Sequence, residues 1–434
     1  MNQAAKRVVI IGGGFAGLNA AKALGNKPGV QVTLLDSRNH HLFQPLLYQV
    51  ALAGLNPADI AAPIRSILAP FQNITVLLAE ATGFDLAGKR VIVKELDPIP
   101  FDYLILASGS NHAYFGHEEW EQAAPGLKSI EQAREIRRRT LLAFEQAEMS
   151  EDPVERQRLL TFVIVGGGPT GVELAGALAE MSRFTLARDF RRIDPRQSRV
   201  VLIEGGPRLL PAFSRDLSAN ATDKLEKLGV KVQTDCVVTD LDRHGVVACG
   251  ERIPAGTVIW AAGVKASPLG ALLGVPLDRQ GRVLVEEDLS VKGHDYLFVL
   301  GDLAHFIGRD GNPLPGLAPV ALQQGKKAAR NILRDLAGQP RKPYRYLDKG
   351  MLATIGKNKA VGQFRNIHFT GFIAWLAWLF VHIYYLTGFA NRLQVVFHWG
   401  WSYMTFKRGA RLILGQDWRM FLLRGGEKRE EAPK

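Results

Sequence analysis

The chain has 434 residues, 47% of them hydrophobic and 22% charged, which excludes a disordered or fibrous protein and predicts two or three domains. Its formal net charge is +12, and residues 341–434 alone hold 16 Lys and Arg against 5 Asp and Glu. Five of the seven Trp lie in the same stretch. Because these basic residues flank apolar runs, they favour an anionic membrane surface over a nucleic acid as partner.

Two cysteines, Cys236 and Cys249, are too few for a disulfide framework, and their spacing is neither that of metal ligands nor that of a redox pair. We therefore expect two ordinary side chains of a small β region and no metal site. The first strand begins near Lys6, which leaves no room for a signal or transit peptide, so we expect a reducing compartment.

The first glycine-rich turn follows the apolar run at 8–11 and reads Gly12-Gly13-Gly14-Phe15-Ala16-Gly17. A buried strand, such a turn and a following helix form the dinucleotide-binding fingerprint. Its first glycine makes the turn, the second lets the backbone approach a pyrophosphate, and the third lets the helix pack on the strand. Asp36 ends the next predicted strand, where an acid accepts hydrogen bonds from a ribose.

The second fingerprint follows the apolar run at 162–165 and reads Gly166-Gly167-Gly168-Pro169-Thr170-Gly171. Before it, a strand at 103–107 ends in Ser108-Gly109-Ser110, a place where the backbone can approach a cofactor, and 129–158 is a predicted helical connector. The strand at 199–203 ends at Glu204, the ribose position, although Glu204 lies farther from its glycines than Asp36 does. An acid there disfavours a 2′-phosphate, so we expect NADH over NADPH.

The strand at 258–262 ends at Gly263, and the chain then returns to the first domain. An apolar strand at 296–300 leads into Gly301-Asp302, beside a helix that begins near Ala318. An aspartate at this place can accept hydrogen bonds from a ribityl chain. Two fingerprints in one chain are typical of an enzyme that passes a hydride from a nicotinamide to a flavin.

The tail holds two apolar stretches. Residues 369–386 are almost uncharged, and as a helix they would reach about 27 Å, just short of a comfortable membrane span. Residues 393–406 place one set of apolar side chains on a single helical face and run into a basic cluster: Leu393, Val396, Phe397, Trp401 and Met404, then Lys407, Arg408 and Arg411. This pattern is typical of a helix that lies in the membrane plane. We rank monotopic attachment above a buried helix pair, and both above a spanning helix.

Together these motifs resemble those of the type II NADH:quinone oxidoreductases, the single-subunit, non-pumping NADH dehydrogenases. The resemblance spans essentially the whole chain and rests also on residues 41–51, 318–325 and the tail from Lys349. It implies that the first fingerprint holds FAD, the second holds NADH, and the C-terminal segment attaches the enzyme to the membrane. Dithiol and sulfide:quinone reductases use paired cysteines with a characteristic spacing, which Cys236 and Cys249 do not match. Soluble ferredoxin reductases resemble the first 330 residues but do not need a basic, aromatic tail such as this one.

The predicted FAD site comprises Gly12, Gly13, Gly14, Phe15, Ala16, Gly17, Asp36, Ser37, Ala81, Gly109, Gly301, Asp302, Ala318 and Pro319. The predicted NADH site comprises Gly166, Gly168, Pro169, Thr170, Gly171, Glu204 and Gly263. For the quinone we predict Gln323 and Pro319. Gln323 matches the second glutamine of the A-Q-x-A-x-Q segment of many family members, whereas Pro319 replaces the first.

Glu173 is the predicted catalytic group. It stands in the first turn of the helix that points at the flavin, the resemblance implies a functional glutamate there, and quinol formation needs two protons. The alternative is a surface acid that offsets the helix dipole. Gln323 is predicted to hydrogen-bond a quinone carbonyl, with a helix-surface amide as its alternative, and no role is assigned to His382 or His398.

We therefore predict an α/β fold of two Rossmann-like domains with a C-terminal segment of amphipathic, membrane-attaching helices. The expected boundaries are 1–115 and 266–335 for the FAD domain, 116–158 for a connector, 159–265 for the NADH domain and 336–434 for the anchor. The expected activity passes electrons from NADH through FAD to a membrane quinone, without proton pumping, at the cytoplasmic face of the inner membrane. A soluble NAD(P)H-dependent reductase of a protein partner and an FAD- and NAD-binding redox sensor are the alternatives, and homodimerisation stays open.

Overall fold

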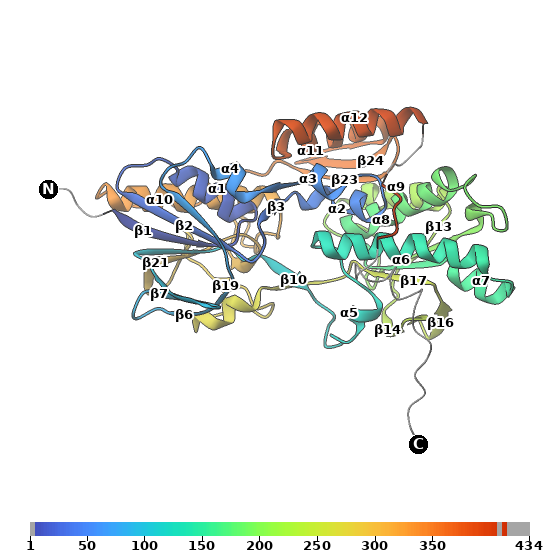
Figure 1. The fold of residues 1–434 in the computed structure, drawn as a ribbon, viewed down its shortest axis with the longest axis horizontal. Helices are drawn as coiled ribbons and strands as arrows, with labels where there is room; N and C mark the ends of the chain where they lie inside the picture. The colour runs from blue at the N-terminus through green and yellow to red at the C-terminus, as the bar shows by residue number, and fades with distance from the viewer. Residues whose placement is uncertain (1–4, 406–409, 415–434) are drawn as a thin grey trace, which may run out of the picture.

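Two α/β lobes make up the protein in the computed structural model, which describes residues 5–405 and 410–414 (Figure 1). The first lobe holds a six-stranded sheet of order β20-β21-β9-β1-β2-β5, parallel except for the β20–β21 pair. Its strands are β1 (Lys6–Ile11), β2 (Val30–Asp36), β5 (Ile74–Leu78), β9 (Tyr103–Leu106), β20 (Ser290–Val291) and β21 (His294–Val299). One face packs on α1 (Phe15–Leu24) and α10 (Ala318–Leu336), and the other on β6 (Ala81–Asp85), β7 (Arg90–Val93) and β8 (Leu96–Pro100).

The second lobe repeats this plan with a four-stranded parallel sheet of order β13-β12-β11-β17. Its strands are β11 (Thr161–Val165), β12 (Arg199–Ile203), β13 (Val230–Gln233) and β17 (Thr257–Trp260). One face packs on α8 (Pro169–Glu180) and α9 (Arg215–Lys227), and the other on β14 (Val238–Asp242), β15 (Gly245–Ala248) and β16 (Glu251–Pro254). The predicted strands at 103–107, 199–203, 258–262 and 296–300 are thus confirmed, each within a few residues.

Two of the chain crossings between the lobes lie side by side, and a long helical connector follows the first of them. The crossings pair with each other as antiparallel strands, β10 (Ser110–His112) and β18 (Val264–Ala266). The predicted helical connector forms α6 (Ile130–Met149) and α7 (Pro153–Leu159). Ser129 begins α6, because its hydroxyl accepts a hydrogen bond from the Gln132 backbone N–H at 3.2 Å.

Both glycine-rich turns have the geometry that the fingerprint requires. Gly12 and Gly166 have φ of +98° and +111°, a backbone region that favours glycine. A Cβ at Gly17 would lie 1.9 Å from the Gly12 carbonyl oxygen, and one at Gly171 would lie 1.8 Å from the Gly166 oxygen. The third glycine of each motif therefore lets its helix approach its own turn. A strand side chain is also close, Ile10 at 3.1 Å from the first such Cβ and Leu202 at 3.4 Å from the second, in line with the predicted packing of helix on strand.

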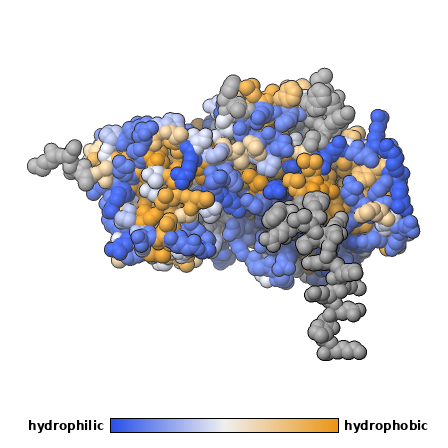
Figure 2. Space-filling view, viewed as in Figure 1, coloured by the Kyte–Doolittle hydropathy of each residue, from blue (hydrophilic) through white to orange (hydrophobic). Residues whose placement is uncertain are grey.

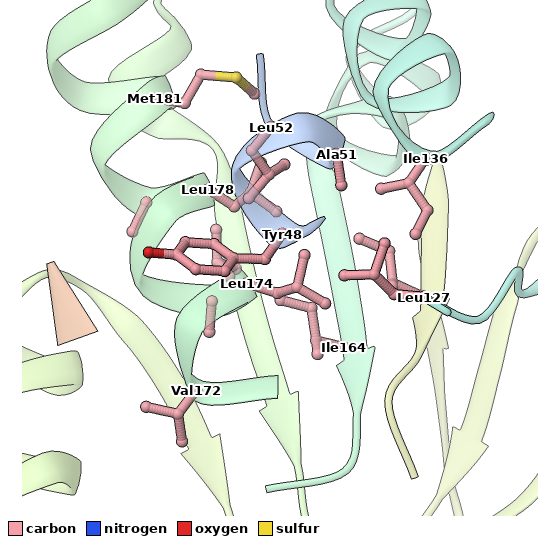
Figure 3. Close-up of a cluster of buried hydrophobic side chains, with 14 of the residues drawn as sticks. Tyr48, Ala51, Leu52, Leu127, Ile136, Ile164, Val172, Leu174, Leu178 and Met181 are labelled. Carbon is pink, nitrogen blue, oxygen red and sulfur yellow. The ribbon is translucent and has the colours of Figure 1, made fainter. Parts of the chain in front are cut away.

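Short elements connect these layers. They are β3 (His40–Leu42), a 3-10 turn (Gln44–Leu46), α2 (Leu47–Ala51), α3 (Pro57–Ile60), β4 (Ala61–Pro63), α4 (Ile64–Leu68), α5 (Trp120–Ala123), β19 (Val283–Leu284) and β22 (Ala304–His305). Although α2 belongs to the first lobe by sequence, it packs into the second. Figure 3 shows Tyr48 and Ala51 of α2, and Leu52 just after it, among Leu174 and Leu178 of α8. A segment of the first lobe therefore packs directly against α8.

The C-terminal region contains a sheet as well as the predicted helices. β23 (Met351–Gly356), β24 (Lys359–Phe364) and β25 (Ile367–Thr370) form an antiparallel sheet that packs on α8. The approach is close, because a Cβ at Gly176 would lie 1.7 Å from the Ile355 carbonyl oxygen. α11 (Gly371–Tyr385) and α12 (Phe389–Thr405) follow. Part of the predicted anchor is therefore bound to the second lobe.

The two predicted tail helices are confirmed, with 15 residues in α11 and 17 in α12. Among the described residues no helix is long and apolar enough to cross a membrane. Lys407 and Arg408 lie outside the described residues, and the side chains of Trp401 and Met404 are likewise not described. In Figure 1 the two helices lie along one edge of the molecule, and the space-filling view of Figure 2 shows apolar residues at that edge.

The two cysteines are joined: Cys236 and Cys249 form a disulfide whose Cα atoms lie 5.3 Å apart. The prediction of two ordinary side chains was wrong, because spacing along the chain does not measure distance across a hairpin. Cys236 precedes β14 and Cys249 follows β15, and the antiparallel pair Val238–Ala248 brings those two ends together.

Candidate functional site

A cavity of about 530 Å³ opens at the carboxyl ends of β1, β9 and β21 in the first lobe, the edge where parallel α/β sheets bind ligands. Most of the predicted FAD residues line it: Gly12, Gly13, Gly14, Phe15, Ala16, Asp36, Gly109, Gly301 and Asp302. The others do not line it: Gly17, Ser37, Ala81, Ala318 and Pro319. Gly17 lies behind the turn, and Ala81 is buried in the core on the opposite face of the sheet.

Each fingerprint is completed by the acid at the end of its second strand. In the first lobe the Gly13 N–H donates to Asp36 Oδ2 at 2.6 Å. In the second lobe the Gly167 N–H donates to Glu204 Oε2 at 2.5 Å, and the Gly206 N–H donates to Oε1 at 2.7 Å. The two acids therefore occupy equivalent places. The longer spacing before Glu204 is taken up by a π-turn (Met181–Thr185) and the loop that follows α8.

The space beside each turn is open at the glycine that precedes the helix. A Cβ at Gly14 or at Gly168 would meet no atom within 4 Å, and each glycine is the N-cap of a helix, whose first N–H groups have no partner within the helix. In the first cavity Ser108 Oγ and His40 Nε2 are buried and have no hydrogen-bond partner within the described protein. Buried polar atoms usually have partners, so these two atoms fit a site that a polar ligand such as FAD completes.

Lys128 is a residue of this cavity that the sequence did not reveal. Its Nζ donates to Ser110 Oγ at 2.7 Å, and Ser110 Oγ donates to Asp302 Oδ2 at 2.6 Å. Burial lowers the pKa of Lys128, while the nearby Asp302 carboxylate opposes that shift. A single lysine before a helix N-cap matches no sequence motif for ligand binding. Lys128 reaches the cavity only because the connector folds back over it.

Glu173 lines a second cavity, of about 130 Å³, between α2, α8, the β23–β24 hairpin and α11. The other lining residues include Tyr48, Gln49, Ala177, Glu180, Thr354, Lys357, Trp375, Trp378, Leu379 and Trp399. The Glu173 side chain is half-buried and lines this cavity, and loss of hydration raises its pKa to about 8. The Thr354 backbone and the Trp378 indole favour the ionised form but only partly offset that effect. The carboxyl is therefore protonated at neutral pH.

Aromatic and amide groups from distant segments surround Glu173. The Trp399 indole N–H donates to Gln49 Oε1 at 2.7 Å, and Gln49 Nε2 donates to the Tyr48 hydroxyl at 2.9 Å. Trp378 stacks on His382 with ring centres 4.2 Å apart, and burial lowers the pKa of His382 to about 4, so its imidazole is neutral. The sequence did not predict this wall, because α2 and α12 lie some 350 positions apart.

The predicted quinone residues lie elsewhere. Pro319 and Gln323 line a small cleft of about 70 Å³ with Lys349 and Tyr385. Both atoms of the Gln323 amide are engaged by the backbone of Leu347: Nε2 donates to its carbonyl, and Oε1 accepts from its N–H, each at 3.0 Å. The structure does not bring Gln323 and Glu173 to one cavity. Contact of Gln323 with a quinone stays a prediction.

Comparison with known proteins places this chain in a family. Residues 6–325 match the model of the pyridine nucleotide-disulphide oxidoreductases. The type II NADH:quinone oxidoreductase NdhA of Mycobacterium tuberculosis is 45% identical over 427 residues, covering 94% of this chain and 90% of that protein. The chain belongs to the type II NADH:quinone oxidoreductases. A member from Staphylococcus aureus is 31% identical, covering 84% of this chain and 90% of its own length.

Solved structures share the fold at lower identity. NDH2 from Plasmodium falciparum in complex with NADH has a TM-score of 0.86 at 20% identity, covering 94% of this chain and all of that one. The sulfide:quinone oxidoreductase of Aquifex aeolicus has a TM-score of 0.71 at 21% identity, covering 88% of this chain and 91% of its own. The predicted fold class, with two dinucleotide-binding domains, is thus confirmed.

Proposed function

We propose that this protein oxidises NADH and passes the electrons through FAD to a membrane quinone. The observation that carries the proposal is the pair of equivalent glycine–acid turns, one on each lobe. The second turn leads into α8, which carries Glu173 to a cavity that α11 also lines. The names of the relatives from Mycobacterium tuberculosis and Staphylococcus aureus support the same activity. When bound, FAD supplies a carrier that takes up a hydride and releases electrons to the acceptor.

The first cavity would hold FAD by contacts along its whole length. Asp36 would accept hydrogen bonds from the adenosine ribose, and the N–H groups at the start of α1 would receive the pyrophosphate. Lys128 would supply a half-buried positive charge for the same anion or the adjoining ribityl chain. Asp302, held by Ser110, would accept from the ribityl hydroxyls.

The second lobe would hold NADH in the same manner. The turn from Gly166 to Gly171 would receive its pyrophosphate, and Glu204 its adenosine ribose. The negative charge of Glu204 disfavours a 2′-phosphate, which supports NADH as the substrate.

Replacing Glu204 tests that assignment. In Glu204→Ala we expect the KM for NADH to rise about 10-fold, because hydrogen bonds to a charged acceptor are lost. The gap between NADH and NADPH should narrow, and the flavin content should stay unchanged. Steady-state kinetics with both nucleotides measure this. Glu204→Gln is the matched variant, since it keeps an acceptor but loses the charge. An unchanged preference in both variants would remove Glu204 from the ribose site.

The Glu173 cavity would receive the quinone ring. Its aromatic walls suit a flat apolar ring, and a carboxyl that is protonated at neutral pH can donate to a quinone oxygen. The proposal is tested by following the flavin spectrum: NADH should bleach it, and a short-chain quinone should restore it over many turnovers. A redox sensor would show bleaching without turnover, and a reductase of a protein partner would need that partner.

The protein would meet the membrane through α11 and α12, without spanning it. α11 has an inner face, where Ala374 and Trp378 are buried, and an outer face that is apolar yet exposed. The exposed apolar side chains of the two helices are Phe372, Ile373, Leu376, Phe380, Val381, Tyr384, Leu393, Val396 and Phe397. A contiguous apolar surface of this kind marks an interaction site, and a lipid surface would also hold the quinone. We propose the cytoplasmic face of the inner membrane as its place.

Exposed apolar residues can be replaced without touching the core. In Ile373→Ser/Phe380→Ser/Phe397→Ser we expect vesicle binding to fall at least about 10-fold, because less apolar area enters the lipid. Activity with a water-soluble quinone should persist. The control Leu78→Ser/Val154→Ser/Val237→Ser removes equally exposed side chains elsewhere and should bind vesicles like the parent. Sedimentation with phosphatidylcholine vesicles measures both, and equal binding by both variants would contradict attachment through these helices.

A further inference from the structure

A row of basic side chains lies on the first lobe, outside the two tail helices. It combines the solvent side of α10 with the extended segment 340–349, which runs back alongside that helix. Three contacts hold the segment there: Arg334 Nε donates to the Pro340 carbonyl at 2.6 Å, Asn331 pairs with the Lys342 backbone at 3.1 Å, and Gln323 pairs with the Leu347 backbone at 3.0 Å. We call the resulting surface the α10 basic patch: Lys326, Lys327, Arg330, Lys342, Arg345 and Lys349.

The α10 basic patch has no carboxylate partner among the described residues. None of its six side chains makes an ion pair there, whereas the neighbouring Arg341 is paired with both Asp288 and Asp335. The cations also act on one another: burial first, and then repulsion from Lys342, Arg330, Arg334 and Arg345, lowers the pKa of Lys327. Like charges held close together repel, so an approaching anion lowers the free energy of this surface.

The patch borders the apolar outer face of α11. Lys349 Nζ donates to the Tyr385 hydroxyl at 2.6 Å and lies 5.3 Å from the centre of that ring. The Tyr385 ring contacts that of Tyr384 at 5.1 Å, and Tyr384 contacts Phe380 at 6.4 Å between centres. Tyr384 and Phe380 are 61% and 72% exposed. The basic patch and the exposed apolar surface of α11 are therefore adjacent, separated only by the Tyr385 ring.

We propose that the α10 basic patch binds the headgroups of anionic phospholipids. The inference rests on the proposed membrane attachment and extends it. It assigns the preference for anionic over neutral lipids to residues outside the two apolar helices. A membrane presents a layer of anionic headgroups directly beside an apolar interior. The protein surface has the matching order, from the cation Lys349 through Tyr385 and Tyr384 to the apolar Phe380. A nucleic acid or an acidic protein would use the cations but leave the apolar neighbours exposed.

The test removes three exposed cations of the patch that line neither cavity of the proposed site. Arg330→Ser/Lys342→Ser/Arg345→Ser should lose about 100-fold in affinity for vesicles of equal parts phosphatidylcholine and phosphatidylglycerol, since each such cation near an anionic surface contributes about a fivefold factor. Its binding to pure phosphatidylcholine vesicles, its flavin content and its turnover with a water-soluble quinone should match those of the parent. The full-length protein is used throughout.

A matched control removes the same charge elsewhere. Lys94→Ser/Lys231→Ser/Arg279→Ser replaces exposed cations away from α10 and should keep the parent's preference for anionic vesicles. Equal losses in both variants would overturn the proposal, because net charge alone would then explain the effect. If the patch variant lost binding to DNA or to an acidic peptide but kept its binding to vesicles, the proposal would also be overturned. It would likewise be overturned if inorganic phosphate fully displaced the parent protein from anionic vesicles. A parent that binds neither vesicle would refute membrane attachment itself, whereas a parent that binds both equally would refute only the patch.

Discussion

Gly14→Val is expected to give a folded, colourless protein that holds no FAD. Gly14 begins α1 with φ −70° and ψ −163°, an extended conformation that valine adopts readily. A Cβ there meets no protein atom within 4 Å, so the fold should tolerate it. The same empty space is where a pyrophosphate would approach the N–H groups of α1, and the valine methyl groups would fill it.

The equivalent variant in the second lobe is the control for this experiment. Gly168→Val adds the same side chain to an equally open turn, so we expect normal flavin content but no bleaching by NADH. Absorbance of the purified proteins and of NADH-treated samples distinguishes the two, and thermal unfolding checks that both are folded. Flavin retained by Gly14→Val, or lost equally from both variants, would contradict the assignment of FAD to the first lobe.

Much of this site follows from local rules of sequence. A buried strand that runs into Gly-x-Gly-x-x-Gly sets the turn, and an acid at the end of the next strand completes it, as Asp36 and Glu204 show. The rule located Glu204 despite its long spacing because the strand end, rather than a residue count, determines where the side chain lies. Glu173 was predicted from its closeness to the second glycine-rich turn and from the family resemblance. Its expected place in the first turn of α8 was wrong, because α8 begins at Pro169 and its first turn holds no acid.

The features that the sequence did not predict arise from contacts between distant segments. Lys128 reaches the first cavity through the connector, and Trp378 and Trp399 reach Glu173 from the tail. The hydrophobic periodicity of the sequence does not distinguish these residues, because each lies in a sequence pattern that is equally typical of a side chain packed in a core or on a surface. The disulfide was missed in the same way, since the pairing of β14 with β15 brings Cys236 and Cys249 together across 13 positions.

Glu173→Gln is expected to slow quinone reduction by about 100-fold or more, the usual contribution of a positioned proton donor. The flavin should stay bound, and its bleaching by NADH should keep the parent's rate, because hydride transfer needs no side-chain acid. Stopped-flow absorbance separates the two half-reactions. Glu180→Gln is the matched control, since Glu180 lies on the same helix and lines the same cavity. Equal slowing by both variants would contradict a specific role for the proton of Glu173, because Glu180 shares only its helix and its cavity.

The pH dependence gives an independent readout of the same group. Burial raises the pKa of Glu173 from 4.5 to about 8, so the folded protein holds this proton where the unfolded chain releases it. Stability should therefore fall as pH rises from about 4.5 to about 8, and Glu173→Gln should remove that part of the dependence. Quinone reduction by the parent should decline above about pH 8, as the carboxyl loses the proton that it donates. A parent whose quinone rate is flat across that range would leave Glu173 as a buried acid without a part in the reaction.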